Sequence, residues 1–267
     1  MERAIQIANS IKAEGNTPLS KSQLKEIISL IDYTTLNETD TEESVKSWMD
    51  NSIELMNSVS TYCGAWCVYP EFVALIKENR NDLPISIAAV SGNFPTGKAI
   101  TQVKIDEALL AEALGAEEID VVINKGWAKE GSFLKIEKEL QLIKGSLERA
   151  HLKVIMETGL LSPESIYEIS KASLRAGADF IKTSTGKTEK GASLEAVAIM
   201  CFAIKEHYEQ SAMMVGIKPS GGISDAEEAA LYIKLVRNIL GDGWINNKLF
   251  RIGASRLLTN TINKLSE

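Results

Sequence analysis

Short runs of β-branched and aliphatic residues alternate with longer amphipathic segments from about Leu30 to the end of the chain. The runs predict strands at Leu30–Thr34, Ala65–Tyr69, Ile85–Val90, Glu118–Ile123, Lys153–Glu157, Asp179–Thr183, Met213–Lys218 and Leu249–Gly253. The amphipathic segments predict helices near Thr41–Ser58, Glu71–Asn79, Ala99–Leu114, Phe133–Ala150, Pro163–Ala176, Leu194–Tyr208, Ala226–Leu240 and Arg256–Lys264. Helical crossovers make the strands parallel, and eight such units close into a single (β/α)8 TIM barrel of the α/β class.

Local signals at the helix starts agree with these boundaries. Asp40 with Glu43, and Ser224 with Glu227, have the spacing of capping boxes. Pro163 fits the first position of a helix, where its missing N–H costs nothing. We therefore expect helices to begin directly after Asp40 and Ser224.

A short segment precedes the barrel pattern. Residues 1–29 divide around Gly15 into two short helical patterns, and Ser20 with Gln23 predicts a capping box for the second. We interpret residues 1–29 as a helical N-terminal extension, an accessory lid over the bottom of the barrel. Residues 30–267 then form one barrel domain, a common size for this architecture.

Composition narrows the function classes. The net charge of −7 argues against a nucleic-acid or anionic-membrane partner, so binding of an anionic substrate must be local. The N-terminus lacks the apolar core of a signal peptide, and the three cysteines are too few for a disulfide framework. We expect a cytoplasmic protein with no membrane partner, and the oligomeric state stays open, a homodimer included.

Barrel enzymes carry their reacting groups at the carboxyl ends of the strands. Here those positions hold ionisable and hydroxyl side chains, namely Asp32, Thr34, Thr35, Cys67, Asp120, Asn124, Glu157, Lys182 and Lys218. Burying so many charges in apolar runs is expensive unless they pair. We therefore expect the amines and carboxylates to form one network, whereas Cys67 faces either the barrel centre or the helix layer.

Two strand-end lysines are the strongest signal for chemistry. Lys182 and Lys218 each end an apolar run and are followed by glycine and hydroxyl residues. A lysine amine attacks a carbonyl only when neutral, which requires its pKa to fall by roughly 3 units, or about 4 kcal/mol. A second cation nearby supplies part of that shift, although charge alone does not say which lysine is the nucleophile.

Glycine-rich loops follow strands six, seven and eight. Ser220–Ser224 and Gly253–Arg256 occupy the loops that commonly bind phosphate in such barrels, and Gly186 with Lys187 would close a third side. Together with the lysine pair, these loops indicate a phosphorylated carbonyl compound as the substrate.

The segments around the two lysines, together with Glu118–Val122 and Arg251–Ser255, resemble those of the 2-deoxyribose-5-phosphate aldolase family over Leu30–Leu258. The resemblance implies a class I aldolase that cleaves 2-deoxy-D-ribose 5-phosphate reversibly to D-glyceraldehyde 3-phosphate and acetaldehyde. It assigns Lys182 to the Schiff base, Lys218 to activation and proton transfer, and Asp120 to acid–base work. Asp32 is expected to orient Lys218, and no metal or organic cofactor is expected.

The same resemblance gives a phosphosugar-binding set, made up of Thr185, Gly186, Lys187, Gly221, Gly222, Ser255 and Arg256. Family members usually have two consecutive serines where this chain has Ser255 and Arg256. The substitution leaves the hydrogen bonding open, although a guanidinium suits a phosphate.

Other functions fit the same fold, because a fold does not fix chemistry. Another class I aldolase and a phosphosugar isomerase are the main alternatives, and a non-catalytic phosphosugar-binding barrel is a third. An isomerase typically needs a strand-end carboxylate base and no activated amine, so trapping of an imine separates these classes.

Overall fold

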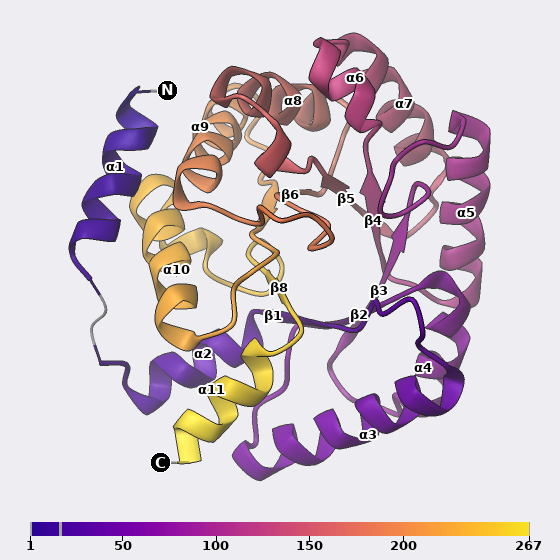
Figure 1. The fold of residues 1–267 in the computed structure, drawn as a ribbon, viewed down its shortest axis with the longest axis vertical. Coiled ribbons are helices and arrows are strands. Elements are labelled where there is room, and N and C mark those ends of the chain that lie inside the picture. Colours follow the sequence, from indigo (N-terminus) through magenta and orange to yellow (C-terminus); the bar gives the residue numbers. More distant parts are fainter. Residues whose placement is uncertain (1, 16–17, 267) are drawn as a thin grey trace.

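The computed structural model describes residues 2–15 and 18–266, which form an eight-stranded parallel barrel (Figure 1). Its strands are β1 (Ile31–Thr34), β2 (Ala65–Val68), β3 (Ser86–Ser91), β4 (Glu118–Val122), β5 (His151–Ile155), β6 (Phe180–Lys182), β7 (Gly216–Lys218) and β8 (Ile252–Ala254). From β1 to β7, each strand pairs in parallel with the next one along the chain, and β1 pairs with β8. Bridges Ile217–Phe250 and Ser220–Gly253 link β7 and its loop to the β8 segment, so the predicted (β/α)8 barrel is confirmed.

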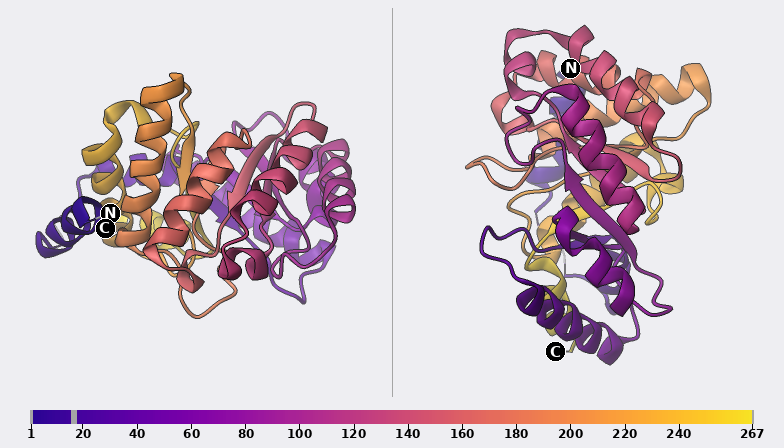
Figure 2. Two further views of the ribbon diagram at one scale, coloured as in Figure 1. Left: turned by 90° about the horizontal axis from the view of Figure 1, so that it is seen from above. Right: turned by 90° about the vertical axis from the view of Figure 1, so that its right-hand side faces the viewer.

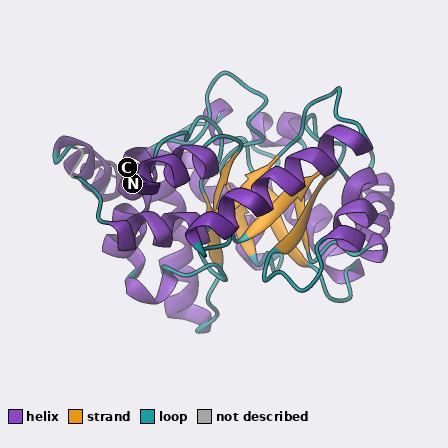
Figure 3. Cartoon of the chain, turned by 90° about the horizontal axis from the view of Figure 1, so that it is seen from below, coloured by secondary structure: helices purple, strands orange, loops and turns teal. Residues whose placement is uncertain are grey.

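Helices surround the strands in the view of Figure 1, and Figure 3 shows purple helices in front of and beside the orange strands. They are α1 (Glu2–Ala13), α2 (Lys21–Ser29), α3 (Glu42–Val59), α4 (Val73–Asn79), α5 (Thr101–Leu114), α6 (Lys125–Glu130), α7 (Phe133–Ser146), α8 (Pro163–Arg175), α9 (Leu194–Ser211), α10 (Ala226–Leu240) and α11 (Leu257–Ser266). All the expected helices are present. The sequence pattern missed α6, whose single turn-and-a-half is too short for a periodic signal; Asn124 caps it by accepting from the amides of Gly126 and Trp127.

Side chains alternate between two apolar environments along the strands. In β3, Ile87 and Ala89 belong to the large core between strands and helices, whereas Ala88 and Val90 belong to a small cluster inside the barrel. Successive residues of a strand point to opposite faces, which explains the alternation. The small size of the interior cluster leaves the rest of the barrel centre to polar groups.

The observed helix caps correct two of the predicted ones by one residue. Thr41 rather than Asp40 caps α3, and Asp225 rather than Ser224 caps α10. Asp40 cannot serve as the cap because its carboxylate accepts hydrogen bonds from the preceding loop at Thr35. The expected position of Pro163 at the first turn of α8 is confirmed, and so is the capping box that begins α2.

The N-terminal helices lie at the side of the barrel. α1 packs along α9 and α10 through Ala4, Ala8 and Ile11, and α2 packs on α11 and α10. Figure 2 shows α1 at the edge of the molecule. The lid interpretation is therefore wrong for α1, because its small apolar face fits the groove between two outer helices. No helix in the described ranges is long and apolar enough to cross a membrane.

Candidate active site

The strand register places the two candidate lysines side by side inside the barrel. Lys182 on β6 is the register partner of Lys218 on β7, and neighbouring strands lie only about 4.8 Å apart. One oxygen of Asp120 on β4, Oδ2, accepts hydrogen bonds from both amines, each at 2.7 Å. The two nitrogens are therefore no farther apart than twice that distance.

A second set of charges adjoins this trio. Asp32 on β1 contacts Lys218 at 2.5 Å and Lys153 on β5 at 3.1 Å, through the same oxygen Oδ2. Its other oxygen accepts from Arg251 Nη1 at 2.5 Å. Glu118 on β4 pairs with Lys153 and accepts from Arg251 Nη2 at 2.8 Å. The barrel centre thus holds one continuous ionic cluster.

This ionic cluster contains four cations and three carboxylates, namely Lys153, Lys182, Lys218, Arg251, Asp32, Glu118 and Asp120. None of the seven is more than 4% exposed. Buried charges are tolerated when they are paired and hydrogen-bonded, and an excess charge is costly. Loss of one proton from one lysine would make the cluster neutral.

Burial and the neighbouring charges shift the pKa values of the two lysines in opposite directions. Burial and the adjacent Lys218 ammonium lower the pKa of Lys182, although Asp120 opposes them. Burial also works against the charge of Lys218, but Asp120 and Asp32 raise its pKa well above the usual value. Lys182 is therefore the amine that gives up its proton more easily. The pKa of Asp120 is lowered despite its burial, because Lys153, Lys182 and Lys218 surround it.

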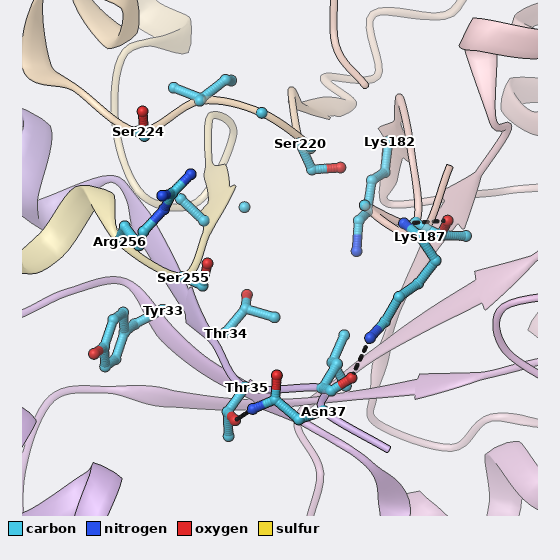
Figure 4. Close-up of a pocket in the computed structure, with 18 of the residues that line it drawn as sticks. Tyr33, Thr34, Thr35, Asn37, Lys182, Lys187, Ser220, Ser224, Ser255 and Arg256 are labelled. Atoms are coloured by element: carbon cyan, nitrogen blue, oxygen red, sulfur yellow. Dashed lines mark hydrogen bonds between the residues drawn. The ribbon is translucent and has the colours of Figure 1, made fainter. Parts of the chain in front are cut away.

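A cavity of about 440 Å³ opens at the carboxyl ends of β1, β6, β7 and β8. Lys182 lines it, whereas Lys218 is fully buried beneath. In Figure 4 Lys182 extends toward the middle of the cavity, Lys187 lies beside it, and Arg256 lies on the opposite side. Three cationic side chains and no carboxylate line this cavity within the described ranges. The local charge therefore favours an anion, against the negative charge of the whole chain.

The predicted glycine loops border the cavity. Gly186, Gly221 and Gly222 have φ values of 76°, 87° and 92°, which favour glycine. Gly191 fits closely against Gly221, because a Cβ on Gly191 would lie 2.0 Å from the carbonyl oxygen of Gly221. The amide of Ala192 donates to that same oxygen at 3.1 Å. The loop after β6 thus fixes the position of the loop after β7.

Two residues of the predicted phosphate set are engaged with the protein. The Thr185 hydroxyl donates to Glu157 Oε2 at 2.6 Å, and Lys187 Nζ donates to the carbonyl of Leu36. Glu157, a candidate for the strand-end network, lies outside the ionic cluster and pairs with Lys125 at 2.6 Å. β5 ends at Ile155, two residues before the predicted boundary, and Glu157 has a left-handed φ of 57° in the turn that follows. Thr185 consequently anchors the loop with its hydroxyl.

Ser255 and Arg256 are exposed, line the cavity and directly precede α11. No carboxylate in the part of the chain that the structure describes forms an ion pair with Arg256. A guanidinium without a carboxylate partner beside a helix N-terminus offers charge and hydrogen-bond donors to an anion.

Cys67 faces the barrel centre. It is fully buried and packs with Ala65, Ala88 and Val90 in the interior cluster. Burial raises the pKa of the thiol, which is therefore protonated and weakly reactive at neutral pH.

Sequence reasoning gave no site role to Lys153, Glu118 or Arg251. One usable signal was the alternation in β4, since Glu118 lies two residues before Asp120 and shares its face. The register that pairs Asp120 with Lys153 gave no such signal. Register depends on how the strands pair in three dimensions, so a single sequence does not reveal it.

Fold and cavity together define an α/β-barrel enzyme with a lysine-rich, carboxylate-supported centre. The chain belongs to the DeoC/LacD family of aldolases, whose family model matches residues 26–239. It is therefore an aldolase, a carbon–carbon lyase.

Relatives agree with this family. A Caenorhabditis elegans protein described as "Putative deoxyribose-phosphate aldolase" is 40% identical over 264 residues, 97% of this chain and 87% of that protein. Among solved structures, "QR15, an Aldolase" is 30% identical with a TM-score of 0.74, covering 90% of this chain and 96% of that one. The deoxyribose phosphate aldolase of Aeropyrum pernix, described as tetrameric, is 25% identical with a TM-score of 0.69, covering 94% and 99%.

Proposed function

We propose that this aldolase cleaves 2-deoxy-D-ribose 5-phosphate reversibly to D-glyceraldehyde 3-phosphate and acetaldehyde, with Lys182 as the Schiff-base residue. One observation carries the assignment of the nucleophile. Lys182 combines contact with the cavity and a lowered pKa, whereas Lys218 is sealed beneath it and held charged. A nucleophilic amine must be both reachable and able to lose its proton.

Lys182 attacks the C1 aldehyde of the open-chain sugar and forms a carbinolamine, which loses water to give an iminium ion. Removal of the proton from the C3 hydroxyl then breaks the C2–C3 bond, and the bonding electrons move into the iminium to give an enamine. D-Glyceraldehyde 3-phosphate leaves at this step. Protonation of the enamine at C2 and hydrolysis of the resulting imine release acetaldehyde and restore Lys182.

Asp120 is suited to the proton transfers. Its Oδ2 binds both amines, while its buried Oδ1 lies 3.4 Å from Lys153 Nζ and accepts no hydrogen bond from the described residues. A buried acceptor of this kind favours a water molecule or the carbinolamine hydroxyl next to Lys182. Lys218 stays charged and supplies the cation that keeps Lys182 acidic, and Asp32 holds Lys218 in place.

The remote phosphate would bind where the glycine loops and Arg256 border the cavity. Backbone N–H groups of Gly221 and Gly222, the Ser255 hydroxyl and the Lys187 ammonium complete the binding set that we propose. Binding there would position C1 against Lys182, so an unphosphorylated sugar should lose turnover as well as affinity.

Borohydride reduction in the presence of acetaldehyde tests this proposal. We expect a two-carbon adduct on Lys182, located by peptide mapping, and no adduct in Lys182→Met. An adduct on Lys218 would reverse the two roles, and no adduct at all would refute the Schiff-base mechanism. Cleavage of 2-deoxyribose 5-phosphate compared with other phosphosugars then separates the proposed substrate from that of another class I aldolase.

A further inference from the structure

Arg251 and Glu118 form the end of the ionic cluster that does not reach the cavity. Arg251 is 4% exposed and donates to both Asp32 and Glu118. Its side chain lies against Gly64, where a Cβ would approach its Nε to 3.0 Å. Glycine at position 64 therefore leaves the room that this guanidinium occupies. Neither charged group touches the cavity that Lys182 lines.

Direct ionic contacts connect this end to the candidate nucleophile. Arg251 contacts Asp32, Asp32 contacts Lys218, and Lys218 shares Asp120 with Lys182. Glu118 joins through Lys153, which also approaches Asp120 at 3.4 Å. Water screens such buried charges poorly, so a charge at one end influences a proton at the other.

The remaining titratable groups near the cluster are two buried thiols and His151, the exposed register partner of Glu118, which pairs with Asp179 outside the cluster. Cys63 precedes β2 and lies within the electrostatic influence of Asp32 and Arg251. Cys67 is similarly influenced by Lys182 and Lys218. Burial raises the pKa of both thiols, so neither adds a charge at neutral pH. β3 contributes no titratable side chain. The four cations and three carboxylates thus account for the cluster's charge.

We infer that Arg251 and Glu118 are positioning residues that set the proton affinity of Lys182 from outside the cavity, through the charge balance of the buried cluster. The inference rests on the proposed function in taking Lys182 as the nucleophile. With Arg251 present, a neutral Lys182 leaves three cations facing three carboxylates. The balance therefore favours release of the Lys182 proton.

The two residues should act with opposite sign. In Arg251→Gln, three cations face three carboxylates when Lys182 is protonated. The cluster is then neutral with Lys182 charged, so the pKa of Lys182 rises. Glu118→Gln removes a carboxylate and lowers the pKa of Lys182. A unit charge at a separation of about 10 Å and an effective dielectric constant of about 20 corresponds to a shift of about one pH unit. A purely structural role would lower stability in both variants without opposed shifts.

The test is the pH dependence of acetylation of Lys182 by acetic anhydride, followed by peptide mapping. This reagent reports the neutral amine without any aldehyde substrate. We expect the half-maximal rate to move up by about one pH unit in Arg251→Gln and down by about one in Glu118→Gln. Arg251→Lys should keep the wild-type midpoint because it keeps the charge, and the double variant Arg251→Gln/Glu118→Gln should return toward it.

Lys104→Met is the matched control. Lys104 is fully buried and pairs with Glu139 at 2.8 Å, outside the cluster, so its loss should destabilise the fold without moving the midpoint. Unmoved midpoints in folded Glu118→Gln or Arg251→Gln overturn the inference, and so do shifts of the same sign. If Arg251→Gln does not fold, Glu118→Gln decides alone. Failure of wild type to form an imine with acetaldehyde would refute the proposed function instead.

Discussion

Replacing Lys218 with methionine removes the cation nearest to Lys182 while keeping most of the side-chain volume. The two amines share one oxygen of Asp120, which places them on the order of 5 Å apart. At an effective dielectric constant of about 20, the repulsion between them is worth about 3 kcal/mol, or about two pKa units. Asp120 would also pair more fully with Lys182, in the same direction.

The pKa of Lys182 is therefore expected to rise by about two units in Lys218→Met, so that its neutral fraction at pH 7 falls about 100-fold. The assay is the rate of imine trapping with acetaldehyde and cyanoborohydride between about pH 6 and pH 10, with mass mapping of Lys182. The rate at neutral pH should fall about 100-fold and should recover toward wild type at the alkaline end.

Recovery at high pH distinguishes loss of activation from loss of structure. Lys104→Met serves again as the control, since it breaks a buried ion pair between α5 and α7 that has no contact with the cavity. An unchanged pH midpoint in Lys218→Met, with the fold intact by circular dichroism, would refute the electrostatic account of Lys182.

Four further changes follow from the contacts, and each has its own measurement. Asp120→Asn should lower the steady-state rate of deoxyribose 5-phosphate cleavage by about 100-fold or more while the apo fold persists. The reason is that the substitution removes the carboxylate that binds both amines and transfers protons. Arg256→Ser should raise KM for the phosphorylated sugar by about 10-fold or more and leave the weak activity on unphosphorylated deoxyribose unchanged. Gly191→Ala should shift the loop after β7 and show a similar loss specific to the phosphate, since its Cβ has no room. His151→Gln should lower the urea midpoint at about pH 5.5 and leave it nearly unchanged at about pH 8.5. A hydrogen bond to Asp179 raises the pKa of His151, so its stabilising effect is present at low pH and disappears as pH rises through the folded-state pKa.

The barrel was predictable because its signal is repeated along the whole chain. Each apolar run followed by an amphipathic segment supports the same parallel architecture, so errors of one to four residues at a boundary do not alter it. The exceptions have local causes. α6 is too short to show a period, and α1 has a face of small residues whose docking surface is made by α9 and α10.

The site was predictable only in part, for a different physical reason. A lysine at the end of an apolar strand is visible in the sequence, and the glycine loops after β6 and β7 are visible too. Which lysine loses its proton depends on three-dimensional neighbours: Asp32 reaches Lys218, and only Lys182 reaches the cavity. Sequence reasoning therefore located the amines but could not rank them without a family resemblance.

The ionic cluster at the barrel centre also lowers the stability of the fold relative to an apolar centre. Replacing paired buried charges with apolar side chains of similar volume is often neutral or stabilising, so ionic pairing alone is a weak reason for such a centre. An excess of one cation over the carboxylates is harder still to reconcile with stability. Such an excess is, however, what a lysine with a lowered pKa requires. The cluster becomes neutral when Lys182 loses a proton, so that proton is the one most easily released. The charge count at the barrel centre thus links the stability of the fold to the reactivity of Lys182. A variant that stabilises the fold by balancing the cluster should for that reason lose activity at neutral pH.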